Sequence, residues 1–156
     1  MDEELICQHH IDTAMKEIKG SVEIDAPAAL VWEAAKDFAS YPKWNPFMVS
    51  VSGELKVGTV LDVVVRTPGR KDRRFPSKVM EIKEHEQLLF KGTQIKGLVS
   101  SDHFIDFVQL GPNKTKFSQN IIFKGIGVPL AGGEIKDSQK GLDQMNGALK
   151  VRCEAK

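Results

Sequence analysis

The chain has 156 residues, a length typical of one domain built around a single hydrophobic core. Its apolar content of 41% with 28% charged residues argues against a disordered chain, and no apolar run approaches the roughly 18 residues of a membrane-spanning helix. The formal net charge is only +1, so the charge balance gives no general attraction to nucleic acid.

Residues 1–14 are expected to form a loosely ordered start that precedes one domain over residues 15–156. The first residues, MDEELICQHH, are acidic and do not resemble a signal peptide. We therefore expect a cytoplasmic protein in a reducing environment.

Two cysteines and a pair of adjacent histidines lie at the ends of the chain. Cys7 and Cys153 are too few for a disulfide framework, although the possibility that they pair is left open. Cys7, His9, His10 and Asp12 look like metal ligands, but adjacent histidines on a strand point in opposite directions and no second cluster completes a tetrahedral set. We expect neither a metal nor another cofactor.

The first predicted elements are one strand and two short helices. Residues 18–25 alternate between apolar and polar side chains, which predicts a half-buried strand. Pro27 fits the first turn of a helix over 27–38, whose apolar side chains recur at helical spacing. Pro42 and Pro46 break that helix and favour a short second helical turn.

From Phe47 to Phe123 the apolar period changes to two. Turn signals such as Gly58, Gly97 and Gly111 separate the runs and predict about six consecutive strands in an antiparallel meander. The side chains expected to face inward include Leu61, Val63, Val65, Phe75, Ser77, Val79, Leu88, Phe90, His103, Ile105, Phe107, Phe117, Gln119, Ile121 and Phe123.

The chain is predicted to end in a long helix from Pro129 to Cys153 with one apolar stripe. Gly141 and Gly147 thin this helix on or beside its buried face, which either permits close packing on the sheet or leaves space. A sheet with one apolar face needs a cover, and this helix is the only element large enough to supply it. A hollow between sheet and helix is the expected ligand site.

Several motifs in this order carry a family resemblance. Residues 21–47, SVEIDAPAALVWEAAKDFASYPKWNPF, resemble the opening of the START-like superfamily called SRPBCC, and within it the polyketide cyclase/dehydrase-type family. The resemblance covers about residues 17–154 and continues through Gly53-Glu54-Leu55-x-Val57-Gly58, Asp102-His103 and Met145-Asn146-x-Ala148-Leu149-Lys150. It implies an α+β helix-grip fold: a curved antiparallel sheet of about seven strands around a long C-terminal helix, with two short helices after the first strand.

The resemblance implies several functions, because the superfamily includes lipid carriers, aromatase/cyclases, chaperone activators and quinone-binding proteins. We expect binding of a hydrophobic small molecule, such as a lipid, fatty acid, quinone or polyketide, in the internal cavity. The expected ligand-binding residues are Trp44, Phe47, Val63, Phe75, Phe90, His103, Phe107, Phe117, Gln119, Leu142 and Met145. For Trp44 the alternative is that it plugs the narrow end of the sheet.

His103 has three interpretations: a core histidine, a ligand contact, or the proton-transfer group of a cyclase/dehydratase-type enzyme.

A further alternative for the function of the protein is a protein-interaction or chaperone-activating module. Its docking surface would be the basic loop over residues 66–74, where Arg66, Arg70, Lys71, Arg73 and Arg74 outweigh Asp72. Anionic headgroups are another possible contact of this loop, which is otherwise a solvated hairpin. Nucleic acid and stable membrane insertion are not expected.

Overall fold

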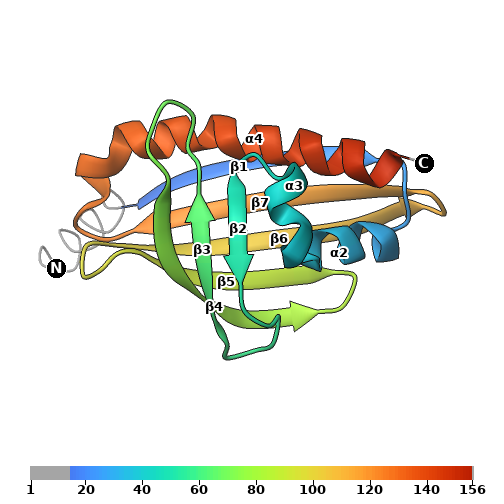
Figure 1. The fold of residues 1–156 in the computed structure, drawn as a ribbon, viewed down its shortest axis with the longest axis horizontal. Helices are drawn as coiled ribbons and strands as arrows, with labels where there is room; N and C mark the ends of the chain where they lie inside the picture. Colours follow the sequence, from blue (N-terminus) through green and yellow to red (C-terminus); the bar gives the residue numbers. More distant parts are fainter. Residues whose placement is uncertain (1–14, 156) are drawn as a thin grey trace, which may run out of the picture.

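The computed structural model describes residues 15–155, which form a seven-stranded antiparallel sheet with one long helix across it (Figure 1). The strand order is β1-β7-β6-β5-β4-β3-β2, so the first and last strands are neighbours and the rest follow as a meander. The elements are β1 (Met15–Ile24), α2 (Ala28–Lys36), η1 (Phe38–Ser40), α3 (Tyr41–Trp44), β2 (Met48–Ser52), β3 (Val60–Val65), β4 (Arg73–Lys83), β5 (Gln87–Ile95), β6 (Val99–Gly111), β7 (Lys114–Lys124), η2 (Val128–Ala131) and α4 (Gly132–Glu154).

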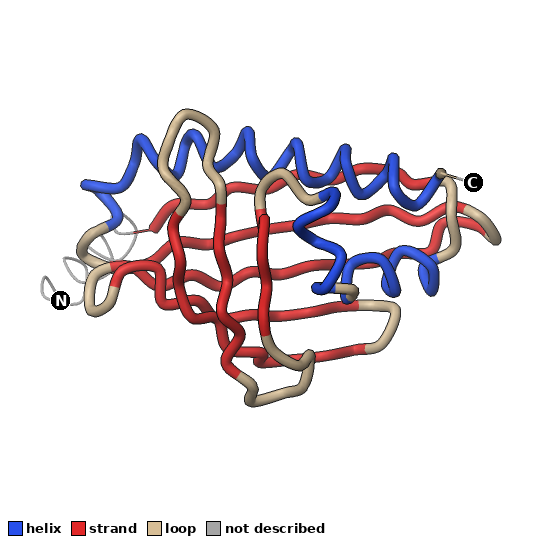
Figure 2. Tube along the Cα trace, in the orientation of Figure 1, coloured by secondary structure: helices blue, strands red, loops and turns tan. Residues whose placement is uncertain are grey.

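The sheet curls around α4, and α2 and α3 lie near the C-terminal half of that helix (Figure 2). This arrangement confirms the predicted helix-grip fold. The inward side chains pair across strands: Val63 lies opposite Phe75, and His103 lies between Phe90 and Ile121. The alternating sequence pattern therefore places one continuous set of buried side chains on the concave face.

The segment after β1 differs slightly from the predicted helix over 27–38. Pro27 is the N-cap rather than a first-turn residue, and α2 ends at Lys36. Phe38–Ser40 form a separate 3₁₀ turn because the backbone of Asp37 leaves the helical region, with φ −77° and ψ 73°. The predicted second helical turn is present as α3.

The last helix begins later than predicted, at Gly132, because Val128–Ala131 form a 3₁₀ turn around Pro129. Gly141 belongs to the buried stripe of α4, whereas Gly147 is exposed. Neither α4 nor any other helix within residues 15–155 is long and apolar enough to cross a membrane. The expected loose start and its candidate metal ligands, Cys7, His9, His10 and Asp12, lie outside the described residues.

Candidate functional site

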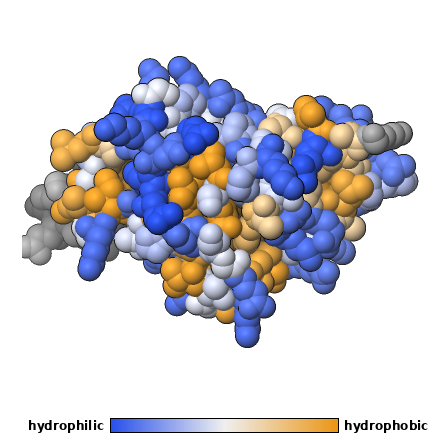
Figure 3. All heavy atoms as spheres, viewed as in Figure 1, coloured by the Kyte–Doolittle hydropathy of each residue, from blue (hydrophilic) through white to orange (hydrophobic). Residues whose placement is uncertain are grey.

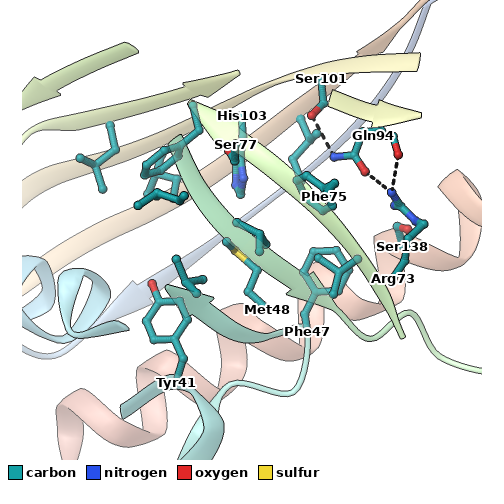
Figure 4. A pocket seen from close by; sticks show the side chains of 18 of the residues that line it. Tyr41, Phe47, Met48, Arg73, Phe75, Ser77, Gln94, Ser101, His103 and Ser138 are labelled. Carbon is teal, nitrogen blue, oxygen red and sulfur yellow. Dashed lines mark hydrogen bonds between the residues drawn. The ribbon is translucent and has the colours of Figure 1, made fainter. Parts of the chain in front are cut away.

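A cavity lies between the concave face of the sheet and the helices, with room of about 40 Å³ for the centres of water-sized molecules (Figure 4). Its wall is predominantly apolar and comes from both ends of the chain. The residues that line it are Ala35, Phe38, Tyr41, Phe47, Met48, Val51, Leu61, Val63, Val65, Arg73, Phe75, Ser77, Leu88, Phe90, Gln94, Ser101, His103, Ile105, Ile121, Phe123 and Ser138.

Five of the eleven expected ligand-binding residues lie on this wall: Phe47, Val63, Phe75, Phe90 and His103. Gln119 does not line the cavity itself, but its side chain is hydrogen-bonded to His103, which does. The remaining predicted residues that are buried pack in the core away from the cavity; they are Phe107, Phe117, Leu142 and Met145.

Phe107 and Phe117 lie away from the cavity because α2 fills their end of the sheet. The ring centroids of Phe107 and Phe117 are 5.3 Å apart, and Trp32 of α2 packs against Phe107 at 5.2 Å. Trp32 is only 3% exposed, so this contact belongs to the hydrophobic core. Inward orientation is thus necessary but not sufficient for a place on the cavity wall.

Trp44 lines a separate outer groove between α2 and the end of α4. The guanidinium of Arg152 lies 5.9 Å from its ring centroid. Cys153 lines the same groove, and burial raises the pKa of its thiol to about 11. Whether Cys153 pairs with Cys7 is a question outside the described residues. Trp44 itself is not on the wall of the internal cavity.

Phe47 is fixed on the cavity wall from two sides. The side-chain oxygen of Asn45 accepts hydrogen bonds from the backbone N–H groups of Phe47 and Met48, at 3.0 and 2.9 Å. On the other side, the ring of Phe47 lies directly on Gly141 of α4, where a Cβ atom would be 2.4 Å from its Cδ1. The proline-rich turn and the helix glycine together set the position of this ring.

A buried chain of polar side chains runs from the cavity to α4. His103 Nε2 lies 2.7 Å from Gln119 Oε1, and Gln119 Nε2 donates to Asn146 Oδ1 at 2.7 Å. Since the Gln119 amide directs its oxygen at the ring, His103 Nε2 carries the proton and donates it. The lone pair of the neutral ring is then on Nδ1.

His103 is held neutral by its surroundings. Burial lowers its pKa from 6.5 to about 4, although the hydrogen bond to Gln119 acts in the opposite direction. Phe90 packs beside the ring with its centroid at 6.1 Å. At neutral pH the imidazole therefore accepts and donates hydrogen bonds without carrying charge.

A second polar group closes the other end of the cavity, away from Tyr41 (Figure 4). Arg73 donates to Glu134 of α4 at 2.9 Å and to the side-chain oxygen of Gln94. Gln94 in turn donates to the hydroxyl of Ser101 at 2.9 Å. The Arg73 guanidinium also lies over the ring of Phe75, at 5.4 Å. This network fastens β4 and β5 to the start of α4.

The arginines of the basic loop are paired with carboxylates. Arg66 bonds to Asp72 and Arg70 to Asp137, at 2.9 and 3.0 Å. Arg73 and Arg74 pair with Glu134 and Asp62. Hydrogen bonding from Arg66 lowers the pKa of the Asp72 carboxyl. Acidic residues outside the loop therefore compensate most of its positive charge. The run of basic residues in the sequence did not indicate these partners.

Arg73→Leu is expected to lower the free energy of unfolding by about 1–2 kcal/mol, because it leaves a part-buried Glu134 carboxylate and Gln94 without their partner. Arg74→Leu is the matched control: its side chain is 72% exposed, and its loss should cost less than about 0.5 kcal/mol. Urea unfolding of both variants measures the difference. Equal losses would contradict an anchoring role for Arg73.

The sequence reasoning missed Tyr41, Gln94, Ser101 and Asn146 as groups in or beside the cavity. Asn146 was recognisable in principle, because it follows Leu142 by one helical turn and so lies on the buried stripe. Tyr41 is fully enclosed: its hydroxyl donates to the backbone oxygen of Ala35, and burial raises its pKa.

Comparison with known proteins gives one family. The model of the family described as polyketide cyclase / dehydrase and lipid transport matches residues 15–154. This confirms the resemblance inferred from the sequence motifs. None of the curated proteins that were compared matches the chain.

Solved structures with a similar fold come from several organisms. A START superfamily protein from Mycobacterium smegmatis is 22% identical with a TM-score of 0.72, over 88% of this chain and 97% of that one. The Zhui aromatase/cyclase from Streptomyces sp. R1128 is 17% identical with a TM-score of 0.75, over 90% and 94%. Norcoclaurine synthase from Thalictrum flavum, in complex with dopamine and hydroxybenzaldehyde, is 18% identical with a TM-score of 0.69, over 91% and 88%. At these identities the likeness concerns the fold alone.

Proposed function

Because the chain belongs to the polyketide cyclase / dehydrase and lipid transport family, we propose that its internal cavity binds a hydrophobic small molecule. The observation that carries the proposal is a concave, largely aromatic and aliphatic wall in which a neutral His103 is a central polar group. Concave apolar sites with a few polar groups are the usual form of small-molecule sites. In this function His103 orients the ligand by a hydrogen bond.

The cavity must widen when it receives such a ligand. Its volume of about 40 Å³ corresponds to only a few water positions, since one water needs roughly 10–15 Å³ by the same measure. Phe47 lies in the connection from α3 to β2, Met48 is the first residue of β2, and Arg73 joins β4 to α4. Rotation of the Phe47 ring on its fixed backbone, or opening of the Arg73–Glu134 contact, enlarges the space without disturbing the central strands.

The charges in the wall favour a neutral ligand. Arg73 is the cationic side chain on the wall, and it already pairs with Glu134. A buried carboxylate, such as that of a fatty acid, would have to compete for this arginine or remain unpaired, which is costly. A quinone, a neutral lipid or a polyketide-like ring system matches the wall better than an ionised acid.

The alternative function is a cyclase or dehydratase in which His103 transfers protons. Its support is the position of an imidazole in the cavity, whose Nδ1 lone pair forms no hydrogen bond within residues 15–155 when Nε2 donates to Gln119. Its weakness is that a pKa of about 4 makes the ring a poor base at neutral pH. Tyr41 does not replace His103 as a proton-transfer group, because its hydroxyl donates a hydrogen bond to the backbone oxygen of Ala35 and burial raises its pKa. Binding is therefore the better-supported function.

Val63→Phe tests the proposal, because Val63 is 1% exposed and its side chain faces the cavity. The larger ring is expected to occupy the free space and reduce binding of an apolar fluorescent probe at least tenfold. Val64→Phe is the matched control, since the next strand residue faces the opposite side of the sheet. The measurement is probe titration, followed by displacement with quinone and neutral-lipid competitors.

Both variants must first give the same circular dichroism spectrum and similar unfolding midpoints. If the probe binds Val63→Phe as tightly as the wild type, the internal cavity is not its site. If His103→Gln retains binding but a polyketone substrate is turned over only by the wild type, the enzymatic alternative replaces the binding function.

A further inference from the structure

Four exposed apolar side chains gather at the end of the molecule where α4 begins. Leu130 is 94% exposed and Ile126 is 78% exposed, both in the connection from β7 to α4. Leu98, in the turn from β5 to β6, is 43% exposed, and Ile95, the last residue of β5, is 40% exposed. We call Ile95, Leu98, Ile126 and Leu130 the apolar end; apolar surface is visible there, at the left of the view (Figure 3).

The two turns of the apolar end are held together by their backbones. The N–H of Gly127 donates to the carbonyl oxygen of Leu98 at 3.0 Å. Gly125 has φ +127°, and a Cβ atom there would lie 2.1 Å from the same oxygen, so a side chain is excluded. The apolar side chains are therefore presented by one fixed backbone arrangement rather than by two independent loops.

Among residues 15–155, the exposed unpaired charges in the segments of the apolar end are cationic. Lys96 lies in the same turn as Leu98, and Lys136 lies in the second turn of α4; both are exposed. Among residues 15–155 neither lysine forms an ion pair. The neighbouring carboxylates are already engaged: Glu134 by Arg73, Asp137 by Arg70 and Asp102 by Lys124.

We propose that the apolar end docks on the surface of an anionic lipid bilayer. Ile126 and Leu130 enter the boundary between headgroups and acyl chains, and Lys96 and Lys136 contact the anionic headgroups. A bilayer fits better than a protein groove because the most exposed apolar side chains project from turns at one end of the molecule, and exposed lysines that suit anionic headgroups lie in or next to the same segments. The contact is peripheral, which agrees with the lack of a membrane-spanning helix in residues 15–155.

The apolar end also adjoins the cavity. A smaller space beneath it is lined by Ile95 and Ala131, and it shares Arg73, Gln94 and Ser138 with the main cavity. Docking would bring the Arg73–Glu134 contact close to the bilayer. The docking itself does not require a ligand in the cavity, so the two proposals are tested separately.

The test is flotation of the full chain with vesicles of phosphatidylcholine, alone or with roughly one third phosphatidylglycerol. We expect binding to the anionic vesicles. Ile126→Ser combined with Leu130→Ser should weaken it by about tenfold or more, because two large aliphatic side chains no longer enter the bilayer. Lys96→Gln combined with Lys136→Gln should weaken it by a similar factor and remove the preference for anionic vesicles.

Val151→Ser is the matched control, because Val151 is 71% exposed near the opposite end of α4. It should bind vesicles like the wild type. All the substituted side chains are exposed, so unfolding midpoints should stay unchanged, and apolar-probe binding in the cavity should persist.

Wild-type protein that fails to float with anionic vesicles would overturn the proposal. So would an equal loss of binding in the Val151 variant. Dimerisation that disappears in the Ile126/Leu130 double variant, without vesicle binding, would assign the apolar end to a second copy of the chain instead.

Discussion

Lowering the pH from 7 to about 4.5 is expected to destabilise the folded protein by about 2–3 kcal/mol through His103 alone. Its folded-state pKa of about 4 lies below the ordinary value of 6.5, so the unfolded chain binds the proton first. The stabilising contribution of the neutral ring is fully present above pH 6.5 and is lost as the pH falls from 6.5 towards 4. The physical cause is the cost of placing an imidazolium in an apolar cavity.

Urea unfolding at several pH values measures this contribution in the wild type and in His103→Gln. The glutamine amide does not titrate, and it can still donate to Gln119 Oε1. Carboxylates that titrate in the same range are common to both proteins, so the difference between their pH slopes isolates His103. Equal slopes between pH 6.5 and 4 would show that the ring is not held neutral by the fold.

The strands of the sheet were predictable because the alternation of apolar and polar side chains is a local property of the sequence. Strict alternation over residues 114–124 and 99–107 gives the buried face directly, and the structure places Phe117, Gln119 and Ile121 on it. The start of α4 was less predictable, because Pro129 is equally suited to the 3₁₀ turn that it occupies and to an α-helical first turn. The spacing of apolar residues therefore predicted which segments are strands and which are helices, but it did not predict where α4 begins.

Which of the inward side chains line the cavity depends on tertiary contacts, and the alternation of apolar and polar residues along a strand does not reveal these contacts. The side chains of Phe90 and Phe107 both face the concave side of the sheet. Phe90 lines the cavity, whereas Phe107 packs against Trp32 of α2. Strand alternation also separates Arg73 from Arg74, although both belong to the same basic run. Arg73 turns inward to Glu134, a partner 61 positions away that only the folded chain brings near. Position along a strand and pairing across the fold decide these roles.

Gly141→Ala is expected to lower the free energy of unfolding by about 1–3 kcal/mol, opposite in sign to the usual effect of this substitution in a helix. The new methyl group would lie 2.4 Å from Cδ1 and 3.1 Å from Cγ of Phe47. The Asn45 hydrogen bonds hold the backbone at Phe47, so the ring has to shift on its fixed backbone. Since Phe47 lines the cavity, that shift should also reduce the binding of an apolar probe.

Gly147→Ala in the same helix is the control, because a Cβ atom there meets nothing within 4 Å. This variant should gain up to about 1 kcal/mol from helix propensity alone and should bind the probe unchanged. Chemical denaturation and probe titration of the two variants therefore separate intrinsic helix propensity from the close contact with Phe47. A stabilised Gly141→Ala variant with normal probe binding would show that the ring yields freely and that this contact does not shape the cavity.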